Sequence, residues 1–206
     1  MYKNYIFDFG QVIVKFDPEY MTKAYINNPN EVKAVEDIIF DRLYWDKLDE
    51  GTITDEEVKQ GICSRLPDHL KEKSCLVYDN WYKNIPFIDG MIELLKEIKQ
   101  NGGRLFLLSN ISKGFVEKYK NVPELVEIFD LFDGLVFSGP IGIVKPSKEI
   151  FKYLLSKYNI KAEDSVFIDD NKNNIDGAKN VGINAILFDG DANKLKSQLL
   201  NGENNV

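Results

Sequence analysis

The sequence predicts an α/β protein with a doubly wound, Rossmann-like parallel sheet and a small helical domain inserted into it. The first observation is a set of short apolar runs, rich in β-branched and aromatic residues, that lack the alternation of a half-exposed strand. The runs are residues 5–9, 104–108, 134–137, 165–169 and 184–188. The second observation is that stretches of helical periodicity separate these runs, which is the order expected of a doubly wound sheet.

Two of the intervening stretches show the apolar spacing of an amphipathic helix. The first places Met91, Leu94, Leu95 and Ile98 on one face. The second places on one face Ile150, Phe151, Leu154, Leu155 and Tyr158. Because each stretch adjoins an apolar run, each predicts a helix that covers the sheet.

The interval between the first two runs departs from this alternation of strands and helices, since it has helical character over its whole length and no convincing strand. Thr54 and Glu57 form the capping-box pattern that begins a helix. We therefore predict a core domain of residues 1–16 and 88–206, and a helical domain of residues 17–87 inserted after the first strand. The aromatic residues expected to form the core of the insertion are Trp45, Trp81, Tyr44 and Tyr82.

Composition limits the classes of partner. The chain has 206 residues, of which 44% are hydrophobic, and a formal net charge of −7. This size allows a sizeable core, and the negative charge without a basic cluster favours a small-molecule partner over nucleic acid. Cys63 and Cys75 match no zinc spacing, and His69 is the single histidine, so neither a disulfide framework nor a histidine metal site is expected.

The sequence also limits the expected location. No apolar run reaches 18 residues and no cleavable leader is evident, so we expect a cytoplasmic protein without a membrane partner. The polar end, residues 201–206, is expected to fray. No pattern in the sequence predicts an oligomeric state.

Polar residues with a common chemistry stand at or after the ends of the apolar runs. Ligands of an open α/β sheet bind in the crevice at the carboxyl ends of the strands, so these side chains are expected to converge there. The residues are Asp8, Ser109, Asn110, Lys145, Asp169 and Asp170.

The types of these residues predict a magnesium phosphate site. Asp8 and Asp170 offer the hard anionic oxygens that Mg²⁺ prefers. Asp8 is also a plausible nucleophile that would form an aspartyl-phosphate, because a carboxylate can divide a displacement into two easier steps. Lys145 would add a fixed positive charge beside Asp8 and the phosphate, and Pro146 and a helix beginning at Ser147 would place it on a stiff turn. Asp8 and Lys145 are therefore the predicted catalytic residues.

Four further residues are expected to support this chemistry. The Ser109 hydroxyl and the Asn110 backbone N–H, at the start of the following helix, would bind phosphate oxygens together with Lys145. The same pair could instead form an ordinary helix cap, and the two roles are compatible. Asp169 is expected to orient Lys145, and Asn174 to hold a water molecule on the metal.

These motifs resemble those of the haloacid dehalogenase superfamily of hydrolases. Residues 7–13, 108–110, 144–146 and 167–175 are most similar to its small sugar-phosphatase branch, with the α-glucose-1-phosphate phosphatases and the phosphatase-like N-terminal domain of epoxide hydrolases. The resemblance covers nearly the whole chain. It implies that the helical insertion is a cap domain, which closes over the site, excludes water and selects the substrate.

One position departs from the family pattern. The typical family phosphatase has a second aspartate two residues after the nucleophile, as general acid and base, and here that position is Gly10. The Gly10 carbonyl can still bind magnesium, but the lost acid removes a contribution of about 100-fold to 10,000-fold. Gln11, Asp17 or a metal-bound water are candidates to replace it, and the sugar-phosphatase branch tolerates glycine at this position.

The expected function is Mg²⁺-dependent hydrolysis of a small phosphorylated metabolite, in the first instance a sugar phosphate. The alternative is a non-catalytic protein that binds a phosphorylated ligand, and its support is Gly10. A metal-free dehalogenase is disfavoured because Asp169 and Asp170 suit a cation, and a phosphomutase because it depends on the acid that Gly10 replaces. The residues of and beside the insertion considered for substrate selection are Phe16, Arg42, Tyr44 and Trp45.

Overall fold

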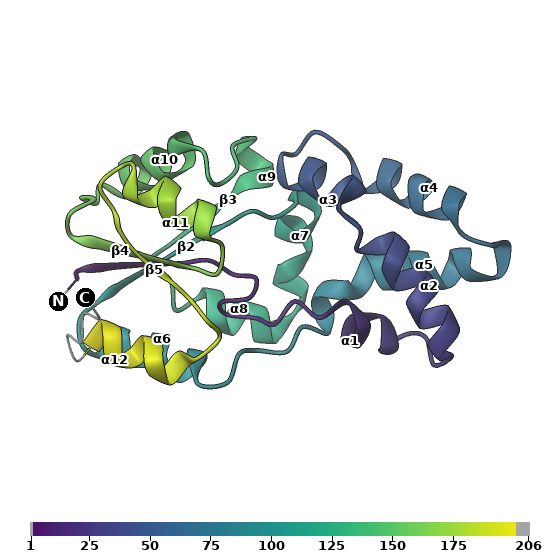
Figure 1. The fold of residues 1–206 in the computed structure, drawn as a ribbon, viewed down its shortest axis with the longest axis horizontal. Helices are drawn as coiled ribbons and strands as arrows, with labels where there is room; N and C mark the ends of the chain where they lie inside the picture. The colour runs from purple at the N-terminus through teal and green to yellow at the C-terminus, as the bar shows by residue number, and fades with distance from the viewer. Residues whose placement is uncertain (1, 201–206) are drawn as a thin grey trace.

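The computed structural model describes residues 2–200 and shows a five-stranded parallel sheet between two layers of helices (Figure 1). The strand order is β3-β2-β1-β4-β5, which confirms the predicted doubly wound α/β fold. The expected frayed end, residues 201–206, lies outside the described residues. The strands are β1 (Asn4–Phe7), β2 (Arg104–Ser109), β3 (Gly134–Phe137), β4 (Ser165–Asp169) and β5 (Asn184–Leu187).

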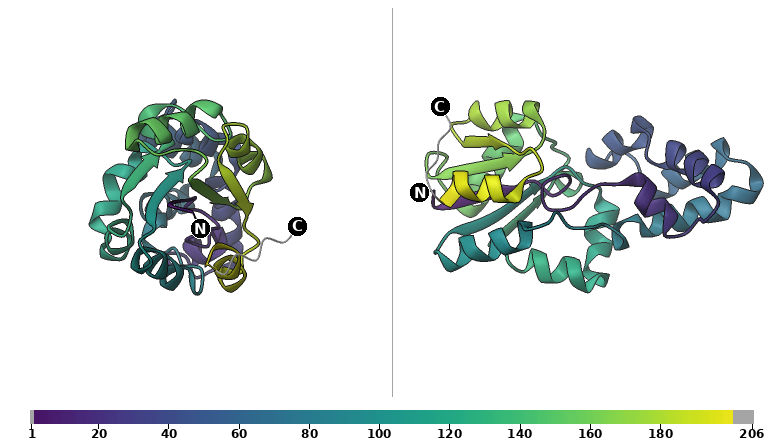
Figure 2. Two further views of the ribbon diagram at one scale, coloured as in Figure 1. Left: turned by 90° about the vertical axis from the view of Figure 1, so that its left-hand side faces the viewer. Right: turned by 60° about the horizontal axis from the view of Figure 1, so that its bottom comes forward.

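Each face of the sheet is covered by its own helices and has its own apolar core. Successive side chains of β1 point to opposite faces of the sheet, so Tyr5 and Phe7 pack in one cluster and Ile6 packs in the other. Figures 1 and 2 show the two helical layers. One layer holds α6 (Met91–Gln100), α8 (Pro123–Phe129) and α12 (Ala192–Leu200), and the other holds α10 (Lys148–Tyr158) and α11 (Lys172–Lys179).

The expectation that all five strands are buried is wrong for β5. The side chains of β5 are half-buried or exposed, and Leu187 is 51% exposed. The reason is its place at the edge of the sheet, where β4 is its only neighbouring strand among residues 2–200. Apolar composition alone does not distinguish an edge strand from a central one.

The other edge strand, β3, has its backbone covered by a side chain of α10. The Leu135 N–H donates to the Tyr158 hydroxyl at 2.8 Å, and that hydroxyl donates to the Leu135 carbonyl at 2.9 Å. The ring reaches the strand because residue 134 is glycine, and a Cβ there would overlap the Tyr158 ring. An edge whose hydrogen-bonding groups are satisfied in this way is protected from pairing with another chain.

All the regular elements between β1 and α6 are helices, and they form a body beyond the carboxyl edge of the sheet (Figure 1). It has its own apolar cluster around Val35, Ile39 and Ile62. The predicted capping box is present, since Thr54 and Glu57 exchange backbone and side-chain hydrogen bonds. The helices are α1 (Pro18–Lys23), α2 (Pro29–Ile39), α3 (Arg42–Asp49), α4 (Asp55–Arg65), α5 (Asp68–Asn80) and the 3-10 helix η1 (Trp81–Lys83).

The chain crosses between the sheet and this helical body twice, and the two crossings lie side by side. The Lys15 N–H donates to the Pro86 carbonyl at 2.8 Å, and the Ile88 N–H donates to the Ile13 carbonyl at 3.0 Å. The helical body is thus attached to the sheet through a short paired connection.

The aromatic residues of the insertion do not form one core as expected. Trp81 and Tyr82 belong to the cluster on the α6 side of the sheet, and Trp45 packs against that cluster. Tyr44 alone of the four packs against the insertion's own cluster. The physical reason is that Trp45 and Trp81, whose ring centroids lie 5.3 Å apart, fill the junction between the two bodies.

Three short elements complete the junction: α7 (Lys113–Lys118), η2 (Tyr119–Asn121) and α9 (Ser138–Ile141). None of the helices of residues 2–200 is long and apolar enough to cross a membrane.

The covered edge leads to a stability prediction. Tyr158→Phe should lower the free energy of unfolding by about 1–3 kcal/mol, because the Leu135 N–H and carbonyl both lose a partner. Urea denaturation measures the change. Tyr153→Phe on the same helix is the control, since the Tyr153 hydroxyl bonds no described residue and its side chain is partly exposed. Equal effects of the two substitutions would contradict the role given to Tyr158.

Candidate active site

Three of the predicted site residues meet because of the strand order. Asp8 directly follows β1, Ser109 is the last residue of β2, and Asp169 is the last residue of β4. Since β1 lies between β2 and β4, their carboxyl ends adjoin. The predicted convergence at the carboxyl edge of the sheet is therefore present for these residues.

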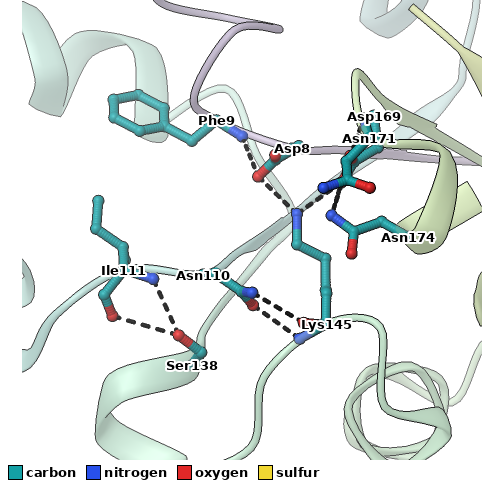
Figure 3. A network of polar contacts seen from close by, with 9 residues as sticks. All are labelled: Asp8, Phe9, Asn110, Ile111, Ser138, Lys145, Asp169, Asn171 and Asn174. Carbon is teal, nitrogen blue, oxygen red and sulfur yellow. Dashed lines mark hydrogen bonds and ion pairs between the residues drawn. The ribbon is translucent and has the colours of Figure 1, made fainter. Parts of the chain in front are cut away.

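Lys145 reaches the same point by a different route from the one expected. It does not follow a strand end directly, because α9 intervenes and the residue lies in the loop between α9 and α10. Its ammonium Nζ lies 2.7 Å from Asp8 Oδ1 and 2.7 Å from Asp169 Oδ2 (Figure 3). The Lys145 side chain is only 1% exposed, so this ammonium and its two carboxylates form a buried ion cluster.

Asn110 holds the Lys145 loop in place, a role that the sequence analysis missed. Its side-chain amide donates to the Lys145 carbonyl at 3.1 Å and accepts from the Lys145 N–H at 2.8 Å (Figure 3). The paired bonds join the end of β2 to the loop before α10. An asparagine directly after a strand is the one sequence signal for such a bridge, and it does not identify the partner.

The expected helix start at Ser109 and Asn110 is wrong. The helix α7 begins at Lys113, and the Ser112 hydroxyl caps it by accepting from the Phe115 N–H at 3.1 Å. Because the capping group lies three residues beyond Ser109, neither Ser109 nor Asn110 is the cap.

Asp169 is held by more contacts than any other acid of the cluster. Besides Lys145, it accepts from the Asn171 N–H at 2.8 Å and from the Asn174 amide at 3.1 Å on both oxygens (Figure 3). Asp169 is fully buried and Asn174 is 8% exposed. These contacts suit a carboxylate that orients Lys145.

The three carboxylates provide an oxygen set that fits a divalent cation. Oxygens of Asp8, Asp169 and Asp170 lie within 4.8 Å of one another. With one ammonium among them, the three acids leave two uncompensated negative charges when ionised, and hard oxygen ligands are those that Mg²⁺ prefers. Asp170 is exposed and no described residue hydrogen-bonds its carboxylate, so it is available as a ligand.

Burial strongly changes the pKa of Asp8. Desolvation raises the pKa of Asp8 to about 7, against the opposing effects of Lys145 and of the Phe9 N–H, which donates to Oδ1 at 2.7 Å. Both close contacts go to Oδ1. The second oxygen, Oδ2, is the one left for a further partner.

A cavity of about 280 Å³ lies between the sheet edge and the helical insertion, and Phe9, Gly10 and Ser109 bring its lining next to this cluster in the chain. Asp8, Lys145 and Asp169 themselves are not among its lining residues. One wall is formed by the segment after β1 and by the end of β2 with the segment that follows it. Its residues are Phe9, Gly10, Gln11, Val14, Phe16, Ser109, Asn110 and Ile111. The opposite wall is formed by the helical insertion, including the segment after η1 that leads back to the sheet. Its residues are Phe40, Arg42, Trp45, Asp49, Trp81 and Ile85. The apolar side chains dominate, which is typical of a small-molecule site.

The cavity includes most of the residues considered for substrate contact. Phe16, Arg42 and Trp45 line it, whereas Tyr44 does not, because its ring packs over Gly61 of α4. Ser109 is 2% exposed, and no described residue hydrogen-bonds its hydroxyl, which leaves this group for a ligand.

Two of the candidates to replace the acid at Gly10 fit poorly. Gln11 lines the cavity, but its amide donates to the Phe16 carbonyl at 3.3 Å, and an amide does not transfer protons at neutral pH. Asp17 is not a cavity residue, since it caps α1 by accepting from the Tyr20 N–H. Another acid, Asp49, does line the cavity, and no motif or spacing in the sequence singles it out.

The sheet order defines a doubly wound α/β protein that holds a buried lysine between two aspartates at the carboxyl ends of its strands. Residues 2–182 match the family of haloacid dehalogenase-like hydrolases, and the chain belongs to this family. The resemblance seen in the sequence is thereby confirmed.

Curated relatives match most of the chain at modest identity. The D-ribitol-5-phosphate phosphatase of Bacteroides thetaiotaomicron is 26% identical over 195 residues, which cover 88% of this chain and 89% of that protein. The drimenol cyclase drtB of Aspergillus calidoustus is 25% identical over 91% of this chain, but the chain spans about a third (34%) of its length. The phosphatase relative, matched over nearly its whole length, supports the class of phosphoric monoester hydrolase.

A solved structure shares the fold. It is a variant of a haloacid dehalogenase family enzyme from Bacteroides thetaiotaomicron, in complex with magnesium and inorganic phosphate. The TM-score is 0.71 at 20% identity, over 95% of this chain and 99% of that chain.

The raised pKa of Asp8 leads to a prediction for the metal-free protein. Between its ordinary pKa of 3.8 and about 7, folded Asp8 keeps a proton that the unfolded chain has released. The unfolded state then binds fewer protons, so stability falls as the pH rises through this window, by at most about 1.4 kcal/mol per pH unit. Asp8→Asn removes this titration, so its stability relative to the unmodified chain should increase from pH 4 to pH 7.

Urea denaturation of both proteins in the presence of a chelator, at pH 4.5 and pH 7.5, measures this difference. The control is Asp176→Asn, a change of an exposed residue of α11. A stability difference between Asp8→Asn and the unmodified chain that is the same at both pH values would contradict the prediction.

Proposed function

We propose that the chain is a magnesium-dependent phosphatase of small phosphorylated metabolites. The observation that carries the proposal is the buried Lys145 ammonium, which contacts both Asp8 and Asp169. A cavity of small-molecule size, lined by Gly10 and Ser109, adjoins this part of the sheet edge. A lysine fixed beside a strand-end carboxylate places a positive charge where a phosphate would meet its nucleophile.

The residues divide the proposed chemistry among them. Asp8 attacks the phosphorus and forms an aspartyl-phosphate, which water then hydrolyses. Lys145 and the Ser109 hydroxyl bind phosphate oxygens, with the Asn110 backbone N–H beside them. Asp169 and Asn174 keep Lys145 in position through the contacts described above.

Magnesium fits this site. Asp8, Asp170 and the Gly10 carbonyl would hold the ion, consistent with the set of close carboxylate oxygens. When bound, the cation would offset the repulsion between the attacking carboxylate and the phosphate.

The helical insertion, residues 17–87, is proposed to act as a cap domain over the core of residues 1–16 and 88–206. It supplies six of the fourteen residues that line the cavity. It also contacts the core directly, since Lys118 of α7 lies 3.0 Å from Asp55 Oδ2 and the Ser138 hydroxyl donates to the Asp49 carbonyl at 2.7 Å. A cap held in this way would exclude water during phosphoryl transfer.

A sugar phosphate is the proposed substrate class. The ribitol-5-phosphate phosphatase relative acts on a phosphorylated polyol, and the cavity combines aromatic side chains with Arg42 and Asp49, which suits a small polar molecule. A second candidate function is binding of a phosphorylated ligand without turnover, which Gly10 favours.

Release of inorganic phosphate from a panel of sugar phosphates, including glucose 1-phosphate and ribitol 5-phosphate, tests the proposal. Phosphate release that depends on magnesium and stops with a chelator is the expected result. Magnesium-dependent binding of a sugar phosphate without release would instead establish the binding function.

Substitution of the nucleophile tests the residue assignment. Asp8→Asn should lower kcat by at least about 10,000-fold, because an amide does not form the aspartyl-phosphate. Incubation with the substrate and trapping of phosphate on the protein should label the unmodified chain and leave the variant unlabelled. Full turnover in the variant would rule out Asp8 as the nucleophile.

A further inference from the structure

Asp49 is an acid of the insertion that the proposed chemistry has not yet used. It is the last residue of α3, and it lines the same cavity as Gly10, Ser109 and Asn110. No described residue hydrogen-bonds or ion-pairs its carboxylate. Removing a carboxylate from water without giving it a hydrogen-bond partner costs free energy, and a bound ligand could supply the missing partner.

The backbone of Asp49 is fixed to the core through Ser138, which bonds the segment directly after Ser109 and Asn110. The Ser138 hydroxyl donates to the Asp49 carbonyl at 2.7 Å and accepts from the Ile111 N–H at 2.9 Å. Ser138 is fully buried, and Figure 3 shows its bond to Ile111 beside the Asn110 and Lys145 contacts. One hydroxyl therefore joins the insertion to the connection that follows Ser109.

The next turn of the chain strengthens this attachment. Gly51 has a φ of +67°, and a Cβ there would collide with the Gly139 carbonyl oxygen. Lys113 of α7 also donates to the Gly51 carbonyl at 3.3 Å. The segment that carries Asp49 thus lies against α7 and α9 of the core at close range.

The charges around Asp49 suit a group that exchanges protons. Burial raises the pKa of Asp49 to about 7, and the charges of Asp46 and Asp8 raise it further, whereas Arg42 and Lys145 lower it. Arg42 and Asp46 lie on the same helix, and Asp8 and Lys145 belong to the core. A carboxyl that is partly protonated at neutral pH can both donate and accept a proton.

We infer that Asp49, supplied by the insertion, is the general acid and base of the reaction in place of the aspartate that Gly10 replaces. The inference rests on the phosphatase function proposed above. It assigns to the insertion a part in the chemistry in addition to its part in enclosing the substrate.

The proton transfers balance over two steps. In the first, Asp8 forms a bond to phosphorus, the ester P–O bond breaks with its electron pair on the leaving oxygen, and that oxygen takes the proton of Asp49. In the second, water attacks phosphorus and gives a proton to the Asp49 carboxylate. The Asp8–phosphorus bond then breaks, and its electron pair restores the Asp8 carboxylate. Phosphate leaves, and Asp49 is protonated again.

The test compares substrates that differ in their need for an acid. Asp49→Asn should lower kcat/KM for the sugar phosphate that the unmodified chain hydrolyses best by about 100-fold to 10,000-fold, because an alkoxide leaves poorly without a proton. With 4-nitrophenyl phosphate, whose leaving group is a stable anion, kcat/KM should fall by less than about 10-fold. The variant should also release 4-nitrophenol in a burst, since its second step lacks the base.

A second variant tests whether the missing aspartate and Asp49 are interchangeable. A Cβ at Gly10 meets nothing within 4 Å, so a side chain can begin there without a clash. Gly10→Asp in the Asp49→Asn background should restore at least about 10-fold of the lost kcat/KM for the sugar phosphate. The matched control is Glu50→Gln, the acid next to Asp49 in the chain, which is exposed and does not line the cavity. It should leave both substrates nearly unaffected.

The outcomes separate the inference from the function on which it rests. Equal losses with both substrates, or no rescue by Gly10→Asp, would overturn the role of Asp49 while leaving the phosphatase intact. No phosphate release by the unmodified chain from any substrate, 4-nitrophenyl phosphate included, would overturn the phosphatase and the role of Asp49 together.

Discussion

The pairing of Lys145 with Asp8 and Asp169 is the constraint on which the rest of the site depends. A buried ammonium is tolerated only beside carboxylates, and buried carboxylates repel one another without it. The three groups come from separate parts of the chain, so each must be placed by the sheet and its loops. The Asn110 bridge to the lysine backbone and the Asn174 amide on Asp169 both preserve this arrangement. Much of the polar structure under the cavity can be understood as support for one cation.

The fold and the central residues of the site could be predicted because local patterns determine them. Continuous apolar runs indicate central parallel strands, and the carboxyl ends of such strands adjoin whatever the length of chain between them. Asp8, Ser109 and Asp169 could therefore be placed together without knowledge of any side-chain contact. Glycine at position 10 could also be recognised as a departure, because the surrounding motif fixes the position of the missing aspartate.

The remaining features depend on how separate segments pack, which local patterns do not contain. Trp45 and Trp81 have the composition of a helical core, but they fill the junction between two bodies. The exposed edge position of β5 follows from the strand order, and its sequence resembles that of a central strand. Asp49 lies at the end of an ordinary polar helix, and its relation to Gly10 exists only because α3 is packed against α9. Tertiary contacts of this kind leave no periodic signal in the sequence.

The paired crossing between Lys15 and Pro86 has a consequence for how the protein can diverge. The insertion leaves and rejoins the sheet at one place, so its ends stay together whatever lies between them. The entropy of closing such an excursion rises only with the logarithm of its length. Helices can accordingly be lengthened, lost or exchanged there without disturbing strand register. The sheet can therefore stay the same while the helical body changes, and the two parts of the chain can accumulate changes at different rates.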